Sequence, residues 1–253
     1  MSIIEAVIMG AVQGLTEFLP ISSSGHLVLL QRIFGMTGEN IAFDIAMHIG
    51  SLIAVIIIFR KTIWSLIKHP FSPLAIKLYL ATIPTIVIVL IFKSFIESTF
   101  TGNFFLVGFV LTAIILAISE YIAKKYKNDS PITKTNAIVL GIAQGLATLP
   151  GVSRSGTTIA TGLIMGDKKE EVAEFSFLMS IPIIIASAVY ELIFQFDSTT
   201  IEVIPTLIGM LFAFIFGFIA IKWMLRLIRK ANLIYFSVYL IILVAVILIF
   251  GLV

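Results

Sequence analysis

Long apolar stretches with few polar residues recur along the chain, and six of them are long enough to cross a membrane. The hydrocarbon core of a bilayer is about 30 Å thick and is crossed by about 20 residues of helix. The six stretches are residues 41–59, 74–92, 103–123, 173–195, 203–225 and 233–253. The pattern predicts an all-α polytopic membrane protein with six transmembrane helices.

Two further apolar regions are interrupted by short polar segments. Residues 3–34 break at LPISSSG, and residues 136–166 break at LPGVSRSG. Each arm has roughly 11 to 16 residues, or about 16–24 Å of helix, which is too short to span comfortably. A proline stops one helix, and the serines that follow cap the next. Broken backbone at membrane depth is tolerated only within protein or beside a watery cavity, so we expect two re-entrant helical hairpins.

Composition and charge support a membrane protein and indicate its orientation. The chain of 253 residues is 59% hydrophobic and 12% charged, with a mean hydropathy of +1.13. A soluble domain is about 45–50% apolar and about 25% charged. If both hairpins return to the side they enter from, 13 of the 17 basic residues share one side, in loops 60–73, 124–134, 166–172 and 222–232. This bias predicts a cytoplasmic basic side, and it accounts for the net charge of +3 without a nucleic-acid partner.

The sequence also repeats itself with an offset of 131 residues. GAVQGL at 10–15 recurs as GIAQGL at 141–146, and SSSG at 22–25 recurs as SRSG at 153–156. Each half then holds one hairpin and three spans, and because three is odd the second half enters from the opposite side. We expect a single membrane domain, residues 1–253, built as an inverted-topology repeat of about 1–125 and about 132–253. Such folds place their site near the midplane, where broken helices meet.

The two hairpin tips carry residues suited to binding an anion. A helix N-terminus offers unpaired N–H groups and a partial positive charge. Arg154, the one basic residue deep within an apolar region, adds a guanidinium that suits a phosphate or pyrophosphate. Hydroxyl and glycine groups that we expect to bind substrate surround it: Ser22, Ser24, Gly151, Ser153, Ser155, Thr157 and Thr158. The alternative is that the serines only cap the helices and that Arg154 extends to an interface.

Reactive groups gather at the first tip. Glu17 lies one helical turn after Gln13, and His26 lies three residues after Ser23, within reach of its hydroxyl. Together with Arg154 they form a phosphoryl-transfer constellation, in which Ser23 attacks phosphorus, His26 moves protons and Arg154 stabilises developing charge. Glu17 would hold a divalent cation on the pyrophosphate or orient His26. The alternative is that Glu17 and His26 bond to each other or to the broken backbone.

Other polar residues in the apolar segments are better explained by structure. Asp44 and His48 lie one turn apart and either pair or face the cavity, and we expect a structural role. Glu120 and Glu191 lie near the ends of predicted spans, where we expect them at the membrane interface.

QGLTEFLPISSSGH followed by LPGVSRSGTTI resembles the bacterial undecaprenyl-pyrophosphate phosphatase family, also called the bacitracin-resistance family. The resemblance covers essentially the whole chain. It implies a multi-pass enzyme of the bacterial plasma (inner) membrane that removes the terminal phosphate of undecaprenyl pyrophosphate and so recycles the lipid carrier of peptidoglycan synthesis. The family's site residues fall on Gln13, Glu17, Ser23, His26 and Pro150 to Thr158. It also implies magnesium or calcium, held by Glu17 and Gln13, although Gln13 stands where the family's pattern has a glutamate.

A second function class shares the same features. Inverted repeats with broken helices at the midplane are typical of secondary transporters, so a flippase of polyprenyl phosphate is the alternative. A transporter needs Arg154 and the helix N-termini but does not need Ser23 with His26. The sequence leaves open whether a serine or water attacks, and whether the protein forms a homodimer.

Overall fold

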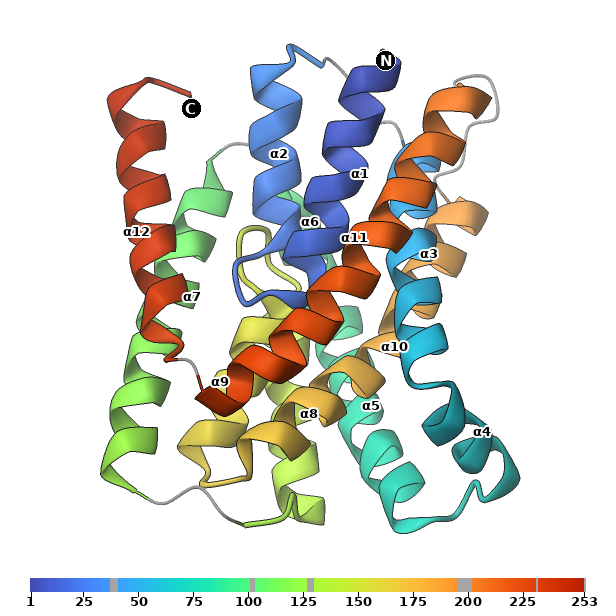
Figure 1. The fold of residues 1–253 in the computed structure, drawn as a ribbon, viewed down its shortest axis with the longest axis vertical. Coiled ribbons are helices and arrows are strands. Elements are labelled where there is room, and N and C mark those ends of the chain that lie inside the picture. The colour runs from blue at the N-terminus through green and yellow to red at the C-terminus, as the bar shows by residue number, and fades with distance from the viewer. Residues whose placement is uncertain (37–40, 101–102, 127–129, 195–201, 231, 253) are drawn as a thin grey trace.

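The computed structural model describes residues 1–36, 41–100, 103–126, 130–194, 202–230 and 232–252. Within these ranges the chain folds into helices α1 to α12, which confirms the all-α prediction (Figure 1). The predicted spans correspond to α3 (Ile41–Ile58), α5 (Pro73–Ile91), α7 (Phe104–Lys125), α10 (Lys169–Phe194), α11 (Val203–Lys230) and α12 (Ile234–Ile249). Each begins and ends within five residues of its predicted bounds.

The six predicted spans differ in how fully they meet the requirements for crossing a membrane. Helices α5, α7, α10 and α11 are each long and apolar enough to cross. Helix α3 is followed by α4 (Arg60–Lys68) after a bend of 78°, and it meets the length and hydropathy requirements only together with α4. Helix α12 is apolar but has only 16 residues. Short helices α4 and α6 (Lys93–Phe100) were not predicted, because they are too short to give a spanning signal.

The two interrupted regions form helical hairpins. The first consists of α1 (Ile3–Phe18) and α2 (Ser23–Ile33), and the second of α8 (Lys134–Leu146) and α9 (Arg154–Ile164). They enter from opposite ends of the molecule, and their tips meet near its middle (Figure 1). The arrangement agrees with the predicted inverted topology.

The repeated motif contains glycines at a spacing of four residues, and these let helices of the two halves pack closely. A side chain added at Gly10 or Gly14 of α1 would meet backbone of α11 at 2.3–2.4 Å. One added at Gly141 of α8 would meet the carbonyl oxygen of Ala81 in α5 at 2.1 Å. Small residues at this spacing allow close helix contact inside a membrane. The first arm of each hairpin is therefore held by the second span of the other half.

Direct hydrogen bonds join the two tips. The Ser155 hydroxyl donates to the carbonyl oxygen of Leu19 at 3.0 Å, and the Gly151 amide donates to Ser24 Oγ at 3.3 Å. Gly151 has φ +80° and lies against the backbone of Phe105, and Ser22 adopts φ 68°, a strained value for a residue with a side chain. Both turns are therefore tightly specified.

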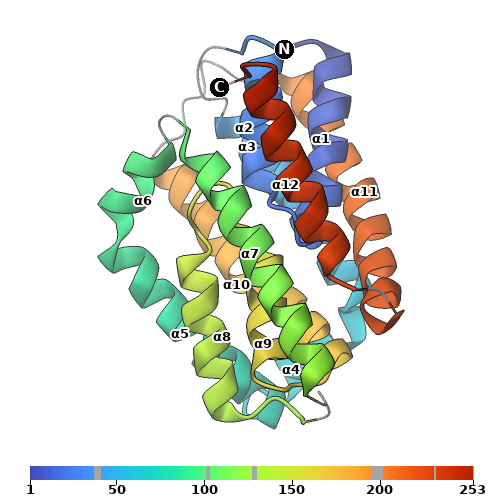
Figure 2. The same cartoon turned by 90° about the vertical axis from the view of Figure 1, so that its left-hand side faces the viewer.

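Helix α12 packs beside α7 (Figure 2). The Leu233 amide at its start donates to Glu120 Oε2 at 3.1 Å, and the Ser237 hydroxyl donates to the carbonyl oxygen of Ala113 at 2.7 Å. The Glu120 side chain is buried and caps the incoming helix, while its expected position at the membrane interface stays a prediction. Glu191, by contrast, is only half-buried and accepts a hydrogen bond from Ser187 at 3.3 Å.

Candidate active site

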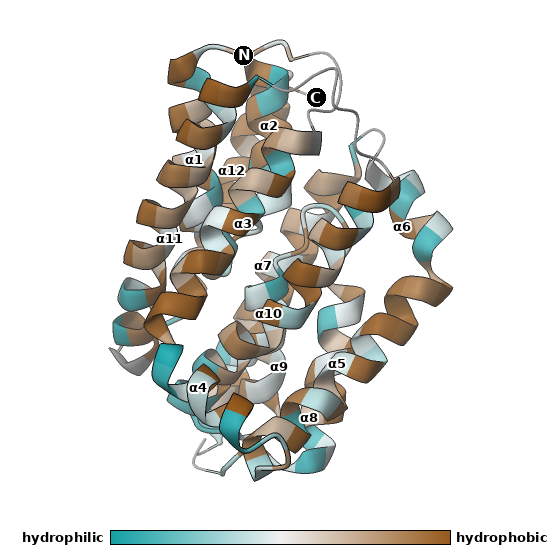
Figure 3. Ribbon diagram, turned by 90° about the vertical axis from the view of Figure 1, so that its right-hand side faces the viewer, coloured by the Kyte–Doolittle hydropathy of each residue, from teal (hydrophilic) through white to brown (hydrophobic). Residues whose placement is uncertain are grey.

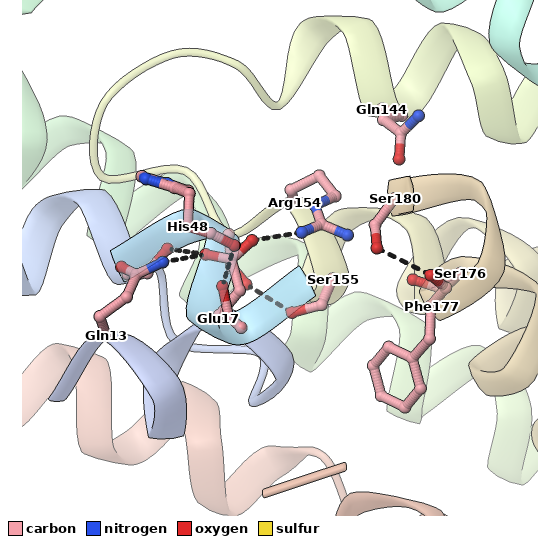
Figure 4. Close-up of polar contacts among 12 residues, drawn as sticks. Gln13, Glu17, His48, Gln144, Arg154, Ser155, Ser176, Phe177 and Ser180 are labelled. Carbon is pink, nitrogen blue, oxygen red and sulfur yellow. Dashed lines mark hydrogen bonds and ion pairs between the residues drawn. The ribbon is translucent and has the colours of Figure 1, made fainter. Parts of the chain in front are cut away.

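Glu17 is the centre of the polar site where the two tips meet. Its buried carboxylate accepts hydrogen bonds at Oε2 from Ser23 Oγ at 2.6 Å and from Gln13 Nε2 at 3.1 Å. The guanidinium of Arg154, from the other hairpin, forms an ion pair with Oε1. Gln13 and Arg154 approach the carboxylate from opposite sides (Figure 4). The structure therefore brings four predicted residues from both halves into one cluster.

Arg154 has bonding capacity left after its pairing with Glu17. Its Nη1 group is buried and has no partner, and the buried Thr157 hydroxyl nearby in sequence has none either. An unsatisfied buried donor costs about 1–3 kcal/mol, and more when charged. Arg154 also begins α9, whose N-terminus favours an anion. A phosphate oxygen would satisfy both requirements.

The predicted pairing of Ser23 with His26 does not form. Nδ1 of His26 donates to the backbone carbonyl of Ser22 at 2.6 Å, and Nε2 lies 2.8 Å from the hydroxyl of Tyr239. Both ring nitrogens are thus engaged away from Ser23, whose hydroxyl instead donates to Glu17. The group that accepts the serine hydrogen bond is a carboxylate, so the predicted contact of His26 with Ser23 is corrected, while a role of His26 in proton transfer stays a prediction.

Tyr239, on α12, was missed by the sequence reasoning. Its ring stacks on His26 with centroids 5.9 Å apart and planes at 3°, and Phe109 of α7 meets His26 edge-on at 5.2 Å. The signal available in the sequence was a tyrosine inside an apolar span, where its hydroxyl favours a polar partner. That signal does not name the partner, which lies 213 residues away.

Most of the other predicted serines and threonines stabilise the tips. Ser22 and Ser153 are the N-caps of α2 and α9. The hydroxyl oxygen of each lies 3.3 Å from the hydroxyl oxygen of the serine two residues later. This matched geometry supports the repeat, because the same capping arrangement occurs at both tips. Ser24 and Ser155 make the contacts between tips, and Thr158 bonds to Ser176 at 2.6 Å. Their contact with substrate stays a prediction.

His48 approaches the cluster from α3 (Figure 4). Its Nδ1 donates to the backbone carbonyl of Asp44 at 2.8 Å. The predicted pair therefore forms through the backbone of Asp44. His48 belongs to the surroundings of the site.

The residues present fit a divalent cation only if substrate supplies part of its coordination. Among the described residues no group of three or more His, Cys, Asp or Glu side chains is placed to hold a metal. The buried Gln13 Oε1, however, has no hydrogen-bond partner and lies beside the Glu17 carboxylate, to which Gln13 donates. Magnesium is commonly held by one or two carboxylates together with substrate phosphates and water, and an amide oxygen is also a hard ligand. Gln13 and Glu17 match that mode of binding.

The charges of the cluster also favour a cation bound together with the substrate. Glu17 and Arg154 form an ion pair and cancel each other. A diphosphate would bring several negative charges into this buried region, and uncompensated buried charge is costly. The arrangement thus combines a hydroxyl, a carboxylate that accepts its hydrogen bond and a guanidinium, and it suits attack on a phosphoryl group in the presence of a cation.

Comparison with known proteins gives consistent matches over nearly the whole chain. A family model described as bacitracin resistance protein BacA matches residues 6–246. The chain is 43% identical over 244 residues to a protein of Carboxydothermus hydrogenoformans named undecaprenyl-diphosphatase, covering 94% of each. Proteins with the same name from Bacteroides thetaiotaomicron and Methanobrevibacter smithii are 38% and 40% identical. The alignments cover 94% of this chain in both cases, and 95% and 94% of those relatives.

Proposed function

The chain belongs to the bacitracin resistance protein BacA family, and from this premise we propose that it is an undecaprenyl-diphosphatase. It is a multi-pass membrane enzyme that converts undecaprenyl pyrophosphate and water into undecaprenyl phosphate and inorganic phosphate. We place it in the bacterial plasma membrane, where this product is the lipid carrier of cell-wall synthesis.

One observation carries the assignment of the site: Ser23 and Arg154, from opposite hairpins, both bond to the Glu17 carboxylate. The serine hydroxyl donates to Oε2 and the guanidinium pairs with Oε1. The proposed nucleophile and the guanidinium therefore meet at the carboxylate that we propose as the base. In phosphoryl transfer the protein contributes mainly positioning and charge stabilisation. A cluster of this composition supplies both.

The reaction then proceeds in two displacements. Ser23 Oγ attacks the terminal phosphorus while its proton passes to Glu17 Oε2. The bond between that phosphorus and the bridging oxygen breaks, and undecaprenyl phosphate leaves with the electron pair. Water next attacks the phosphoserine, inorganic phosphate leaves, and the serine proton returns to Oγ. Arg154 uses its free Nη1 to stabilise charge on the phosphoryl oxygens in both steps.

Gln13 and Glu17 would hold magnesium or calcium together with the diphosphate. The bound ion would neutralise phosphate charge and polarise the phosphoryl group. Support comes from the buried Gln13 Oε1 without a hydrogen-bond partner and from the cancelled charges of Glu17 and Arg154.

Transport of polyprenyl phosphate by a flippase is the weaker reading. The bond between Ser23 and Glu17 favours chemistry, since an anion carrier needs Arg154 and the helix N-termini but gains nothing from an activated hydroxyl. The names of the similar proteins support the phosphatase as well.

The test is phosphate release from undecaprenyl pyrophosphate by purified protein in detergent, with magnesium or calcium and with EDTA. We expect release by the wild type that EDTA abolishes, and its loss in Ser23→Ala and Arg154→Ala. Ser65→Ala, an exposed serine outside the site, serves as the control and should keep full activity. Folded wild type that releases no phosphate with either cation would overturn the assignment.

A further inference from the structure

Helix α4 contains no buried residue, although it adjoins the helix bundle. It leaves α3 through a bend of 78°, and it is the most strongly amphipathic helix described. Because α3 corresponds to a predicted span, a helix at this steep angle to it is expected to run nearer to the membrane plane. It lies at the end of the molecule opposite the N-terminus (Figure 1).

The apolar side chains of α4 and of the turn after it fall into two groups, one facing the core and one exposed. Ile63 packs against the hydrophobic core, and Leu66 is half-buried beside it. Trp64 and Ile67 are 58% and 64% exposed, and Phe71 in the following turn is 84% exposed. Large apolar side chains exposed at this level suit the boundary between lipid tails and headgroups, where tryptophan is enriched.

The polar part of the segment carries charge of a single sign. Residues 60–72 contain Arg60, Lys61 and Lys68 and no Asp or Glu. The Lys68 ammonium lies 5.3 Å from the Trp64 ring centroid, so charge and aromatic ring are adjacent. In Figure 3 hydrophilic residues alternate with hydrophobic ones along α4. Basic residues beside interfacial apolar ones are the combination that attracts anionic lipid.

A shallow, open surface follows directly after the helix. It is formed by Lys68, His69, Pro70, Phe71 and Ser72. Lys68 and Ser72 offer donors for a phosphate group, and Phe71 offers apolar surface for the glycerol and upper acyl region. The turn thus presents polar and apolar groups side by side, as contact with a lipid headgroup requires.

We propose that α4 and the turn 69–72 bind the headgroups of anionic phospholipids in the leaflet on the basic side of the protein. Trp64, Ile67 and Phe71 insert at the acyl boundary, while Lys61 and Lys68 contact the phosphates. A second copy of the chain fits this surface less well. A two-fold contact centred on α4 would place the same basic surfaces opposite each other, with no acidic partner in residues 60–72.

Tryptophan fluorescence tests the proposal, because the chain has only two tryptophans. Trp223→Phe leaves Trp64 as the sole reporter in nanodiscs of mixed phosphatidylglycerol and phosphatidylcholine. Bromine on the acyl chains of one lipid at a time then reports which lipid contacts Trp64. We expect quenching by brominated phosphatidylglycerol to exceed its share of the bilayer. The preference should fall by about fivefold for each lysine removed in Lys61→Gln/Lys68→Gln.

Two further variants make the result specific. Lys124→Gln/Lys125→Gln removes the same charge from the end of α7 and should leave the preference intact. Lys61→Arg/Lys68→Arg keeps the charge and should retain it as well. Equal quenching by both lipids in the wild type, or a preference unchanged by Lys61→Gln/Lys68→Gln, would overturn the proposal. The proposal would also be overturned if the protein were a dimer in which neither brominated lipid quenches Trp64, since a second copy would then cover the helix. Phosphatase activity of every variant checks its folding.

Discussion

The imidazole of His26 and the phenol ring of Tyr239 stack with their planes 3° apart, and the tyrosine hydroxyl lies 2.8 Å from Nε2. His26 donates from Nδ1 to the carbonyl oxygen of Ser22, so the neutral ring accepts at Nε2 from Tyr239. The last helix of the chain is thereby linked to the turn before Ser23. Since Ser22 holds a strained φ of 68°, this link helps to keep Ser23 in place.

Tyr239→Phe should lower kcat about tenfold with little effect on KM. The phenyl ring keeps the stacking, but the buried Nε2 loses its donor, which costs about 1–3 kcal/mol. Steady-state hydrolysis of undecaprenyl pyrophosphate measures the effect. Tyr235→Phe is the matched control on the same helix, because Tyr235 is 72% exposed. Equal losses in the two variants would argue against a role of Tyr239 in positioning His26.

Ser23 and Glu17 should act as one unit. Ser23→Ala is expected to lower kcat about a thousandfold or more, and Glu17→Gln about 10²- to 10⁴-fold. Because the base has no function without the nucleophile, the double variant should be no slower than the worse single one. Rapid-quench measurements of phosphate release test this.

Ser65→Ala is the control for that cycle. Its side chain is exposed and lies outside the site, so we expect no loss of activity. Multiplying losses in the Ser23→Ala/Glu17→Gln variant would instead indicate separate roles and favour direct attack by water.

The sequence was sufficient for the features that depend on length and pattern along the chain. The six apolar stretches and the two interrupted regions locate the spans and hairpins within a few residues. The odd number of spans in each half predicts that the tips approach from opposite sides, and the contact of Ser155 with Leu19 agrees with it. These features follow from membrane thickness and the need to satisfy backbone groups.

Contacts across a turn or between distant helices could not be predicted from the sequence. Helical spacing placed His26 within reach of Ser23, but the turn at Ser22 brings Ser23 back toward Glu17 in α1. The partner of His26 depends on the packing of α12, and the burial of Glu120 depends on the same packing. No periodicity in one sequence encodes which helices become neighbours.

Gly151→Ala should destabilise the protein by about 2–4 kcal/mol. The residue has φ +80°, and an added Cβ would lie 2.0 Å from the carbonyl oxygen of Phe105. Backbone strain and overpacking thus add together. Gly166→Ala isolates the first term, because Gly166 has φ +84° and nothing within 4 Å of the added atom. Thermal unfolding in detergent should show a clearly smaller effect at Gly166, and equal shifts would contradict close packing at the tip.

Gln13→Glu should lower the magnesium concentration needed for half-maximal activity by about tenfold. A second carboxylate beside Glu17 strengthens attraction for a hard cation, and changes around a metal site commonly alter affinity 10- to 100-fold. Gln13→Ala removes Oε1 and should act in the opposite direction. Activity measured across a magnesium titration decides the matter. An unchanged half-saturating concentration in both variants would remove Gln13 from the cation site.

Asp167 should make stability depend on pH. It lies between α9 and α10, and its buried Oδ1 accepts a hydrogen bond from Asn136 at 2.6 Å. Burial raises the pKa of Asp167 and the Glu171 carboxylate raises it further, while the Asn136 hydrogen bond and Lys77 oppose the rise. The folded protein therefore holds this proton more tightly than the unfolded chain does. The Asp167 contribution to stability declines as pH rises from its ordinary pKa through the raised one.

Asp167→Asn keeps an acceptor for Asn136 but does not titrate. The Tm of this variant, relative to wild type, should therefore increase between about pH 4 and neutrality. Thermal unfolding followed across this range measures the difference. Glu171→Gln removes the neighbouring like charge and should shorten the pH interval over which wild-type stability declines. A constant Tm difference between Asp167→Asn and wild type would show that Asp167 titrates at its ordinary value.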